Sequence, residues 1–571
     1  MTTSTTVPNG AMPTDLTAAT PATPAQTADT VTTHTLLNCL IREVSAPERQ
    51  VTVDRDHLLL RLPRRDLLLR ARLRRVSLIG AHRFQGPLQR LTDTAWVPVG
   101  WHELAAYVME ELELRTGHAN GEFLDQVADS RETIRAALEH RTHTMPQQDP
   151  YVASEQALVF GHRFHPTPKA RTGGTADWLA YGPETGARFR LRHLAVRRHL
   201  VQEEGDVTEL DALCPVTDPE FVTLPVHPWQ FRLLSRHNRL RAAMAAGDVL
   251  DKGVSGPEFA PTASVRTLYQ PDTDTFLKFS LNIRLTNCVR KHASYELPGA
   301  VALNGLLQPV MDRLAERFPG CALLEEPGYR TFAADGDTAL VEGFGVIVRS
   351  GLLPHLRPGV TPLLAAAIAD EYATSAAHVS HLLARGNQDV LSWWDTYLRL
   401  LLPPVLSAYF EHGVVMEPHL QNVVVGVHAD GAPAQMLFRD LEGTKLLPHH
   451  HARFLATLPD DVRQPLTYDV EQGWNRVAYC LLVNHVSEVL GALADLEPTL
   501  ESALWGVVRD RLDAYARTAG RPPRLRALLS GVPLPAKANL LLRWARKADR
   551  HATYVPLPSP LGACFPRELN Q

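Results

Sequence analysis

The segment 262–290 combines basic and hydroxyl side chains in an order that suits the binding of a polyphosphate. Counting in twos from Phe276 places five polar residues on one face of a predicted β-hairpin, opposite an apolar face: Lys278, Ser280, Asn282, Arg284 and Thr286. Ser264 and Arg266 stand two residues apart and hence share a face, and residues 271–274 supply the turn. A half-solvated antiparallel sheet shows the same alternation, so the segment alone leaves both interpretations open.

A second set of polar side chains flanks a predicted hairpin in the segment 414–443. An Asp430-Gly431 turn joins the apolar strands 423–427 and 435–438. Antiparallel pairing brings together the residues at the open end of the hairpin: Glu417, His419, Gln421, Asn422, Asp440 and Glu442. Because Mg²⁺ prefers carboxylate and amide oxygens together with phosphates and water, Asn422 with Asp440 or Glu442 predicts a magnesium site. Solvated hairpin ends without a metal are the alternative.

Two shorter segments are candidates for anion binding and for a structural role, respectively. Residues 161–173 read GHRFHPTPKARTG, which crowds two histidines and three cations into loop-like sequence. The Gly173-Gly174 pair would let backbone amides approach a phosphate, although a basic surface loop has the same composition. Residues 224–230, LPVHPWQ, place an aromatic and a polar side chain beside two prolines, which is more typical of structure than of catalysis.

The composition describes a globular chain and excludes several classes of function. A length of 571 residues with 45% apolar side chains allows roughly two to four domains. A net charge of −4 and a pI near 6.7 give no field that would attract nucleic acid or an anionic membrane. The six cysteines lack the spacing of a disulfide framework, zinc knuckle or iron–sulfur cluster, which fits a reducing cytoplasm. No apolar run reaches the length of a membrane span, about eighteen residues.

The sequence divides into four regions. Residues 1–30 are rich in Thr, Ala and Pro and predict a disordered tail. Residues 31–150 predict a helical N-terminal domain with a small sheet, and residues 151–350 predict short strands and hairpins around one strong helix near 299–317. Residues 351–571 predict mainly helices, among them 361–385 and 392–411, the latter bent at Pro403-Pro404.

Taken in order, these segments resemble the siderophore synthetases that work without a nonribosomal peptide template, the enzymes of aerobactin, achromobactin and desferrioxamine assembly. The resemblance rests on seven motifs that cover residues 151–543: GHRFHPTPKARTG, LPVHPWQ, SVRT (264–267), KFSLNIRLTNCVR, EPHLQN, FRDLEG and PAKANLLLR. A single one of these motifs would be a weak signal, but seven in the family's order are specific.

The resemblance implies an α+β architecture shaped like a cupped hand around a central ATP cleft. The thumb would be 31–150, the fingers with the ATP-binding sheet 151–350, and the mostly helical palm 351–571 with the metal-site hairpin. It implies that a carboxylate attacks the α-phosphorus of ATP, and that an amine or hydroxyl then takes the acyl group to give an amide or ester. A homodimer is a further expectation from the family. The form Thr286-Asn287-Cys288-Val289-Arg290 resembles members that activate free citrate.

Carried over residue by residue, the resemblance assigns residues to three roles: binding the triphosphate, holding Mg²⁺ and holding the carboxylic acid. His165, Ser264, Arg266, Thr267 and Lys278 would contact the triphosphate, with Gln421 a further nucleotide contact. Arg290 would bridge nucleotide and acid, and Asn422 and Asp440 would hold Mg²⁺. Thr286, His419 and Lys537 would hold the carboxylic acid, so that Lys278, Arg290 and His419 are the candidate catalytic residues. Fixed cations make physical sense here, because two anions must approach each other and charge then moves onto pyrophosphate.

Two other functions use some of the same residues. A small-molecule kinase has a similar His-x-x-Asn, hairpin and Asp layout, but Gln421 stands where its base Asp would be, and no glycine-rich phosphate loop is recognisable. A siderophore reductase or iron carrier would need a close cysteine set, whereas only Cys480 and Cys564 lie in the C-terminal region.

The adjacent His449, His450 and His451 predict a solvated loop rather than a metal site.

Overall fold

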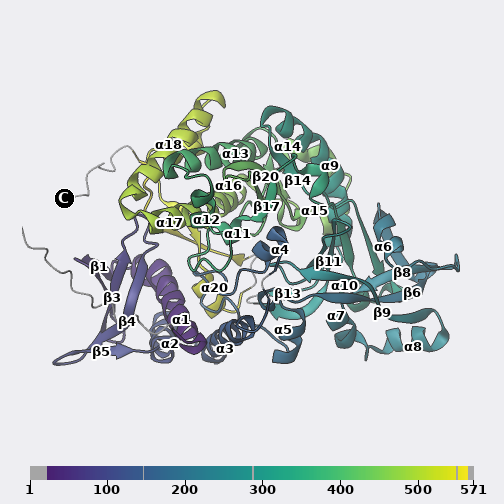
Figure 1. The fold of residues 1–571 in the computed structure, drawn as a ribbon, viewed down its shortest axis with the longest axis horizontal. Coiled ribbons are helices and arrows are strands. Elements are labelled where there is room, and N and C mark those ends of the chain that lie inside the picture. Colours follow the sequence, from purple (N-terminus) through teal and green to yellow (C-terminus); the bar gives the residue numbers. More distant parts are fainter. Residues whose placement is uncertain (1–21, 146, 286–287, 548–550, 563–571) are drawn as a thin grey trace, which may run out of the picture.

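The computed structural model describes residues 22–145, 147–285, 288–547 and 551–562. At the N-terminus an antiparallel meander of five strands packs with three helices, drawn in purple and blue in Figure 1. These elements are α1 (Pro24–Leu40), β1 (Val51–Asp54), β2 (His57–Leu62), β3 (Leu67–Arg75), β4 (Arg83–Leu91), β5 (Trp96–Val99), α2 (Trp101–Thr116) and α3 (Phe123–Arg141).

The first helix begins earlier than the composition predicts. Thr23 accepts a hydrogen bond from the Gln26 backbone while the Gln26 side chain accepts one from Thr23, which is a reciprocal capping box. Pro24 follows at the first helical position, where its missing N–H costs nothing. The prediction of a disordered tail through residue 30 is therefore wrong from Pro24 onward, because the local capping chemistry and the burial of Ala28 outweigh the low-complexity composition.

An eight-stranded sheet follows, in the order β7-β15-β16-β11-β10-β9-β6-β8. Short helices cover it and a small ribbon of β12 and β13 extends from it (Figure 1). The strands are β6 (Phe189–Arg197), β7 (Val201–Gly205), β8 (Phe221–Val226), β9 (Val249–Pro261), β10 (Thr267–Gln270), β11 (Thr275–Phe279), β12 (Leu281–Leu285), β13 (Cys288–Arg290), β15 (Gly328–Phe332) and β16 (Val346–Arg349). The helices are α4 (Pro150–Glu155), α5 (Thr175–Tyr181), α6 (Thr208–Leu213), α7 (Pro228–Leu234), α8 (Asn238–Ala246) and α10 (Thr338–Gly343).

The predicted β10–β11 hairpin and its turn are confirmed, but the single polar face is not. All five residues of β11 are buried, so both faces of the strand are covered. The alternation also stops at Ser280, because β12 begins a separate ribbon in which Asn282 accepts a hydrogen bond from Gln230. Ser264 and Arg266 lie in a tight turn between β9 and β10 and not on a strand face. Thr286 lies outside the described residues.

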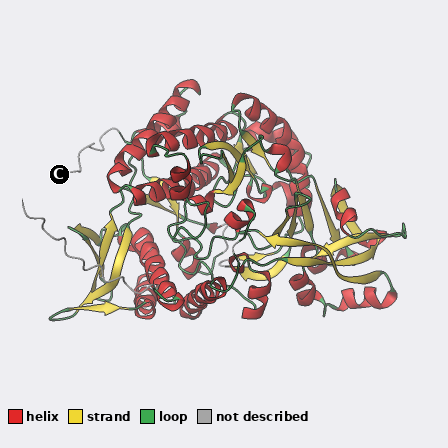
Figure 2. Ribbon diagram, viewed as in Figure 1, coloured by secondary structure: helices red, strands yellow, loops and turns green. Residues whose placement is uncertain are grey.

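The C-terminal part is mostly helical, as Figure 2 shows by colour. Its long helices are α9 (Glu296–Arg317), α13 (Val390–Phe410) and α18 (Glu501–Thr518). A further continuous helical run consists of α16 (Val470–Ala478), a π-helical segment (Tyr479–Val486) and α17 (Ser487–Leu496). The shorter elements are α11 (Ala365–Ile368), α12 (Val379–Arg385), β18 (Val414–Val415), β21 (Lys445–Leu446), α14 (Pro448–Leu455), α15 (Asp460–Arg463), α19 (Pro523–Leu529), β22 (Leu534–Lys537), α20 (Asn539–Trp544) and β23 (Tyr554–Leu557).

A four-stranded sheet lies within this helical part, in the order β14-β20-β19-β17. Its strands are β14 (Cys321–Leu323), β17 (Thr361–Leu364), β19 (Val423–Val427) and β20 (Pro433–Phe438), and the predicted β19–β20 hairpin is confirmed. The predicted helix 361–385 is wrong at its start, because β17 pairs with β19 and tertiary pairing overrides the local pattern. The predicted loop at His449–His451 is also wrong, since Pro448 starts α14.

The hydrophobic cores do not divide at residue 350. Leu303 and Leu314 of α9 belong to the large C-terminal core, and β14 pairs in parallel with β20. One helical run, Val470–Leu496, is long and apolar enough to cross a membrane by length and composition. Because 94% of its most apolar window is buried inside the protein, it is a core helix of this fold.

Candidate functional site

Lys278 of β11 lies at the centre of a buried group of charges. Its side chain is 2% exposed, and its ammonium group contacts three carboxylates, those of Asp440, Glu442 at 3.0 Å and Glu326 at 3.7 Å. Burial disfavours the charged lysine, but the three carboxylates outweigh it and raise the pKa of Lys278. The same contacts join the eight-stranded sheet to the loop after β20, 162 residues away along the chain.

Arg266 forms the second cationic arm of this group. Its guanidinium donates to Glu442 and to Nδ1 of His292, the latter at 3.2 Å. Nε2 of His292 donates to the Lys278 carbonyl at 3.1 Å, which fixes the ring as a neutral tautomer. Burial and the cations Arg266 and Lys278 lower the pKa of His292 to about 3, so the ring stays uncharged and orients Arg266.

The third cation is Arg349 of β16. Its guanidinium donates to Oε1 of Glu326 at 2.6 and 3.1 Å and lies 3.7 Å from Asp440. Burial opposes ionisation of Asp440, yet Lys278 and Arg349 hold the pKa of Asp440 well below its usual range. In the β10–β11–β16 register Thr267 faces Lys278, so Thr267, Lys278 and Arg349 share one face of the sheet.

Two residues of this region have backbone conformations that their side chains disfavour. Asp440 has φ 77° and Val265 has φ 68°, both in the left-handed region that favours glycine. Val265 is β-branched and sits between Ser264 and Arg266 in the turn, where Ser264 Oγ accepts the Thr267 N–H. Such strain of about 1–3 kcal/mol per residue persists where the surroundings fix the backbone, and it concentrates at functional sites.

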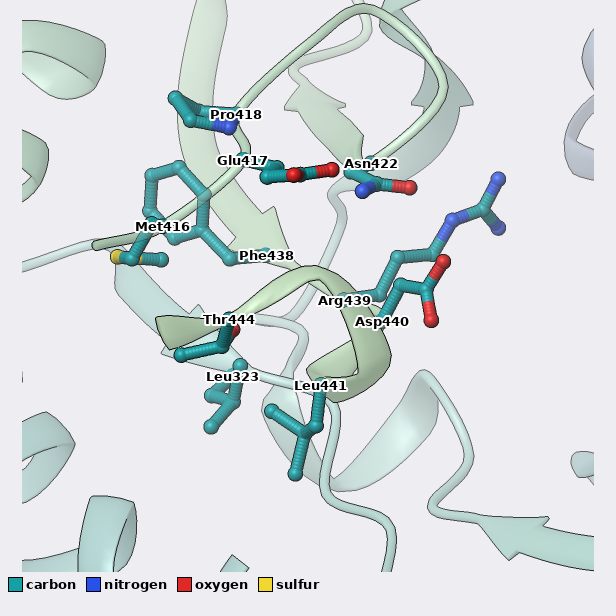
Figure 3. A pocket seen from close by; sticks show the side chains of 10 residues that line it. All are labelled: Leu323, Met416, Glu417, Pro418, Asn422, Phe438, Arg439, Asp440, Leu441 and Thr444. Atoms are coloured by element: carbon teal, nitrogen blue, oxygen red, sulfur yellow. The ribbon is translucent and has the colours of Figure 1, made fainter. Parts of the chain in front are cut away.

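The open end of the β19–β20 hairpin carries oxygen donors. Asn422 and Asp440 line one small hollow together with Glu417 and Thr444, as Figure 3 shows. The Arg439 N–H donates to the Asn422 carbonyl at 3.1 Å, which holds the two ends of the hairpin side by side. The Asp440 side chain is 31% exposed, so a ligand can reach its carboxylate.

A different group also brings three metal-type ligands together within the described residues. Ligand atoms of His292, Glu296 and Glu442 lie within 4.8 Å of one another. However, Nδ1 of His292 and the Glu442 carboxylate both accept from Arg266, so a guanidinium already supplies the positive charge at that point. Burial and the nearby Glu442 raise the pKa of Glu296 to about 7.

Two of the residues predicted to hold an acid, His419 and Lys537, lie beside the loop 161–167. Burial lowers the pKa of His162 to about 4 against the influence of Glu488, and Arg42, Lys537 and His419 lower it further. Asn539 donates to the Phe164 carbonyl at 3.0 Å, which attaches the segment around Lys537 to the loop 161–167. Burial also lowers the pKa of His419, so this imidazole is neutral near pH 7.

The remaining predicted residues lie around these groups. Gln421 donates to the Ala263 carbonyl at 3.4 Å and so sits beside the Val265 turn. Arg290 ends β13 opposite Leu281, and among the described residues its Nε has no hydrogen-bond partner. His165 is buried on the loop after α4, where its Nδ1 accepts from the Thr167 N–H.

Sequence reasoning missed several residues of the charged group, namely Glu326, Arg349, His292 and Glu296. Arg349 ends an apolar strand and His292 follows Arg290 by two residues, so both had a weak local signal. Glu326 had no local signal, because it reaches Lys278 only through the pairing of β15 with β16 and of β16 with β11.

Comparison with known proteins shows which families and relatives this chain resembles. Residues 150–370 match the IucA/IucC family, and residues 391–552 match the family described as ferric iron reductase FhuF-like transporter. The rhizobactin siderophore biosynthesis protein RhbC of Rhizobium meliloti is 29% identical, covering 93% of this chain and 97% of that protein. The L-2,3-diaminopropanoate–citrate ligase of Staphylococcus aureus is 28% identical, covering 74% of this chain and 76% of that protein.

A solved structure shares the fold. The ATP-bound aerobactin synthetase IucA from Klebsiella pneumoniae superposes with a TM-score of 0.83 and 24% sequence identity, covering 93% of this chain and 99% of that one. The sequence predicted an α+β fold, and at this level a fold of mixed helices and strands is confirmed.

Proposed function

We propose, from the premise that this chain belongs to the IucA/IucC family, that it is an ATP-dependent ligase of siderophore biosynthesis. A carboxylate oxygen of citrate would attack the α-phosphorus of ATP, and the bond to pyrophosphate would break. An amine or hydroxyl would then attack the acyl carbon of the adenylate and release AMP. The observation that carries the proposal is the convergence of Lys278, Arg266 and Asp440 from segments far apart in the chain.

In this proposal the cations of the sheet bind the triphosphate. Lys278 and Arg266 now contact carboxylates, and these contacts would be exchanged for phosphate oxygens. Ser264, Thr267 and His165 would add hydrogen bonds, and Gln421 would lie beside the nucleotide. Arg290, whose Nε has no partner among the described residues, is suited to bridge the nucleotide and the acid.

The oxygen donors at the hairpin end fit a magnesium ion. Asp440 and Asn422 line the same hollow and offer a carboxylate and an amide oxygen, the ligand types that Mg²⁺ prefers. When bound there, the ion would neutralise phosphate charge as the pyrophosphate leaves. The low pKa of Asp440 keeps its carboxylate ionised across the physiological range.

The citrate carboxylates would face His419 and Lys537, with Thr286 as a further contact outside the described residues. A neutral His419 can accept a proton from the attacking amine or hydroxyl, because burial holds its pKa below 6.5. Citrate as the acid is supported by the relative that is named a diaminopropanoate–citrate ligase.

The cupped-hand division is part of this proposal. The thumb would be 31–150 and the fingers 151–350, except that α9 and β14 pack with the palm core of 351–571. A cytoplasmic homodimer is the proposed working form, and the cysteines fit a reducing compartment because Cys39, Cys214, Cys321 and Cys480 are free.

The test is product analysis of the purified protein with ATP, Mg²⁺, citrate and a panel of diamines and amino acids. AMP and pyrophosphate, formed only when citrate is present, are expected. ADP together with a phosphorylated substrate would instead identify the kinase-like alternative, and a coloured protein with bound iron would identify the reductase-like one. Succinate and 2-oxoglutarate serve as controls for the acid.

A further inference from the structure

Arg439, the residue before Asp440, uses all of its side-chain donors within the protein. Its Nε and Nη2 donate to the Gln421 carbonyl at 2.9 and 2.7 Å. Its Nη1 donates to the Tyr151 hydroxyl at 2.8 Å and to Glu155 at 2.6 Å, and Nη2 donates to the other Glu155 oxygen at 3.2 Å. A guanidinium has five N–H donors, so Arg439 has none left for a ligand.

Glu155, at the end of α4, connects this arginine to the phosphate-binding turn. Besides accepting from Arg439, its Oε2 accepts the backbone N–H of Ala263 at 3.0 Å. Arg439 and Glu155 are 4% and 1% exposed, so the ion pair is fully buried. The pair therefore links α4, the turn that contains Ser264, the Gln421 backbone and the residue beside Asp440.

The two strained residues flank these anchor points. Val265 lies two residues after Ala263, and Asp440 directly follows Arg439. A non-glycine residue with positive φ is kept in that conformation only when neighbouring contacts fix the chain. The buried pair supplies such contacts to both segments at once.

We propose that Arg439 and Glu155 are positioning residues, which set the distance between the phosphate-binding turn and the metal-binding end of the hairpin without touching a ligand. The inference rests on the proposed function, because that proposal assigns phosphate to the turn with Ser264 and a metal ion to the hairpin end with Asp440. Misplacing one ligand group by about 1 Å costs on the order of a hundredfold in rate, which sets the expected size of the effect.

The test compares Arg439→Lys with a matched variant, Arg75→Lys. A lysine in place of Arg439 keeps the charge beside Glu155 but cannot also hold the Gln421 carbonyl. Arg75 is an equally buried arginine, 3% exposed, that donates to Glu501 and joins β3 to α18. Both variants lose a buried guanidinium, so a general loss of stability would affect both.

For Arg439→Lys we expect kcat/KM for ATP in citrate-dependent pyrophosphate release to fall by about a hundredfold. The Mg²⁺ concentration for half-maximal rate should rise by about tenfold or more, as seen when supporting residues of metal sites are lost. KM for citrate should stay within about threefold of wild type, and Arg75→Lys should stay within about threefold in all three parameters. Thermal unfolding of each variant reports whether it is folded.

The outcomes separate the two proposals. If wild-type protein releases no pyrophosphate, the proposed function fails; if wild type is active and Arg439→Lys matches Arg75→Lys, the positioning role fails. An equal rise in KM for ATP and for citrate would also overturn the positioning role, because such a rise would indicate a general distortion of the site. Should Arg439→Lys not fold, Glu155→Gln decides the question, with a loss of about tenfold or more in kcat/KM for ATP in support and a value near wild type against.

Discussion

Replacing Lys278 with methionine tests the centre of the site most directly. Methionine has nearly the length of the lysine side chain but no charge, so the packing of β11 is preserved. The change leaves Asp440, Glu442 and Glu326 without the cation that all three now contact. Two different losses should follow, one of stability and one of adenylation.

The stability loss can be worked from the distances. At an effective dielectric constant of about 20, a unit charge pair at the 3.0 Å of Lys278 and Glu442 attracts by about 5.5 kcal/mol, and the 3.7 Å pair with Glu326 by about 4.5 kcal/mol. Most of this offsets the cost of burying the charges, and removing one partner of a buried ion pair costs about 3–5 kcal/mol in practice. Adding Asp440→Asn removes one stranded carboxylate and should restore part of that stability.

The catalytic loss is measured as citrate-dependent pyrophosphate release at saturating ATP and Mg²⁺. One well-placed electrostatic donor is worth about a hundredfold to a thousandfold in rate, or about 2.7–4 kcal/mol. Lys169→Met is the control, since it also removes an ammonium group from a carboxylate, that of Glu184, although the Lys169 side chain is more exposed, at 13%. A folded Lys278→Met variant that keeps more than about a tenth of the wild-type rate would refute the assignment of Lys278.

Three further predictions follow from the same structure. Arg290→Ala should stay folded and lose about a hundredfold or more in pyrophosphate release; a wild-type rate would exclude its bridging role. Asp440→Asn should raise the Mg²⁺ concentration for half-maximal rate by about tenfold or more in a metal titration, and an unchanged requirement would remove Asp440 from the metal site. Burial lowers the pKa of His227 to about 3 and that of His485 to about 4, from 6.5, so the unfolded chain binds more protons below pH 6.5. The contribution of these two residues should therefore lower the free energy of unfolding, measured in urea, by about 3 kcal/mol between pH 6.5 and pH 5. Equal stability at the two pH values would contradict the low pKa values of the two histidines.

Local patterns predicted the elements whose cause is local. The helical periodicity of residues 101–116 predicts a helix with these bounds, and the structure has α2 at Trp101–Thr116, where Gly117 ends it in the left-handed conformation. The β19–β20 hairpin was predictable because Asp430-Gly431 sits between two apolar runs. Asn422 and Asp440 could be placed together on that basis, since antiparallel pairing alone brings the hairpin ends together.

Tertiary contacts account for what the sequence did not predict. The alternation from Lys278 onward predicted one polar and one apolar face, yet β11 lies between β10 and β16 and is buried on both sides. Alternation reports which residues share a face, not whether carboxylates from elsewhere cover that face. Glu326 and Glu155 had no local signal, because each acts through a partner more than twenty residues away in the chain.

The charge balance of the site gives a physical reason for metal and nucleotide to enter together. Three cations, Lys278, Arg266 and Arg349, contact three carboxyl groups, those of Asp440, Glu442 and Glu326, so positive and negative groups are matched in number. A polyphosphate alone would bring several negative charges next to Asp440 and Glu442, whose low pKa values keep them ionised. Under the proposed function, a divalent cation at the hairpin end would remove that repulsion and would release Lys278 and Arg266 to the phosphate oxygens. The carboxylates that hold the cations in place before binding are then the same groups that would receive the metal.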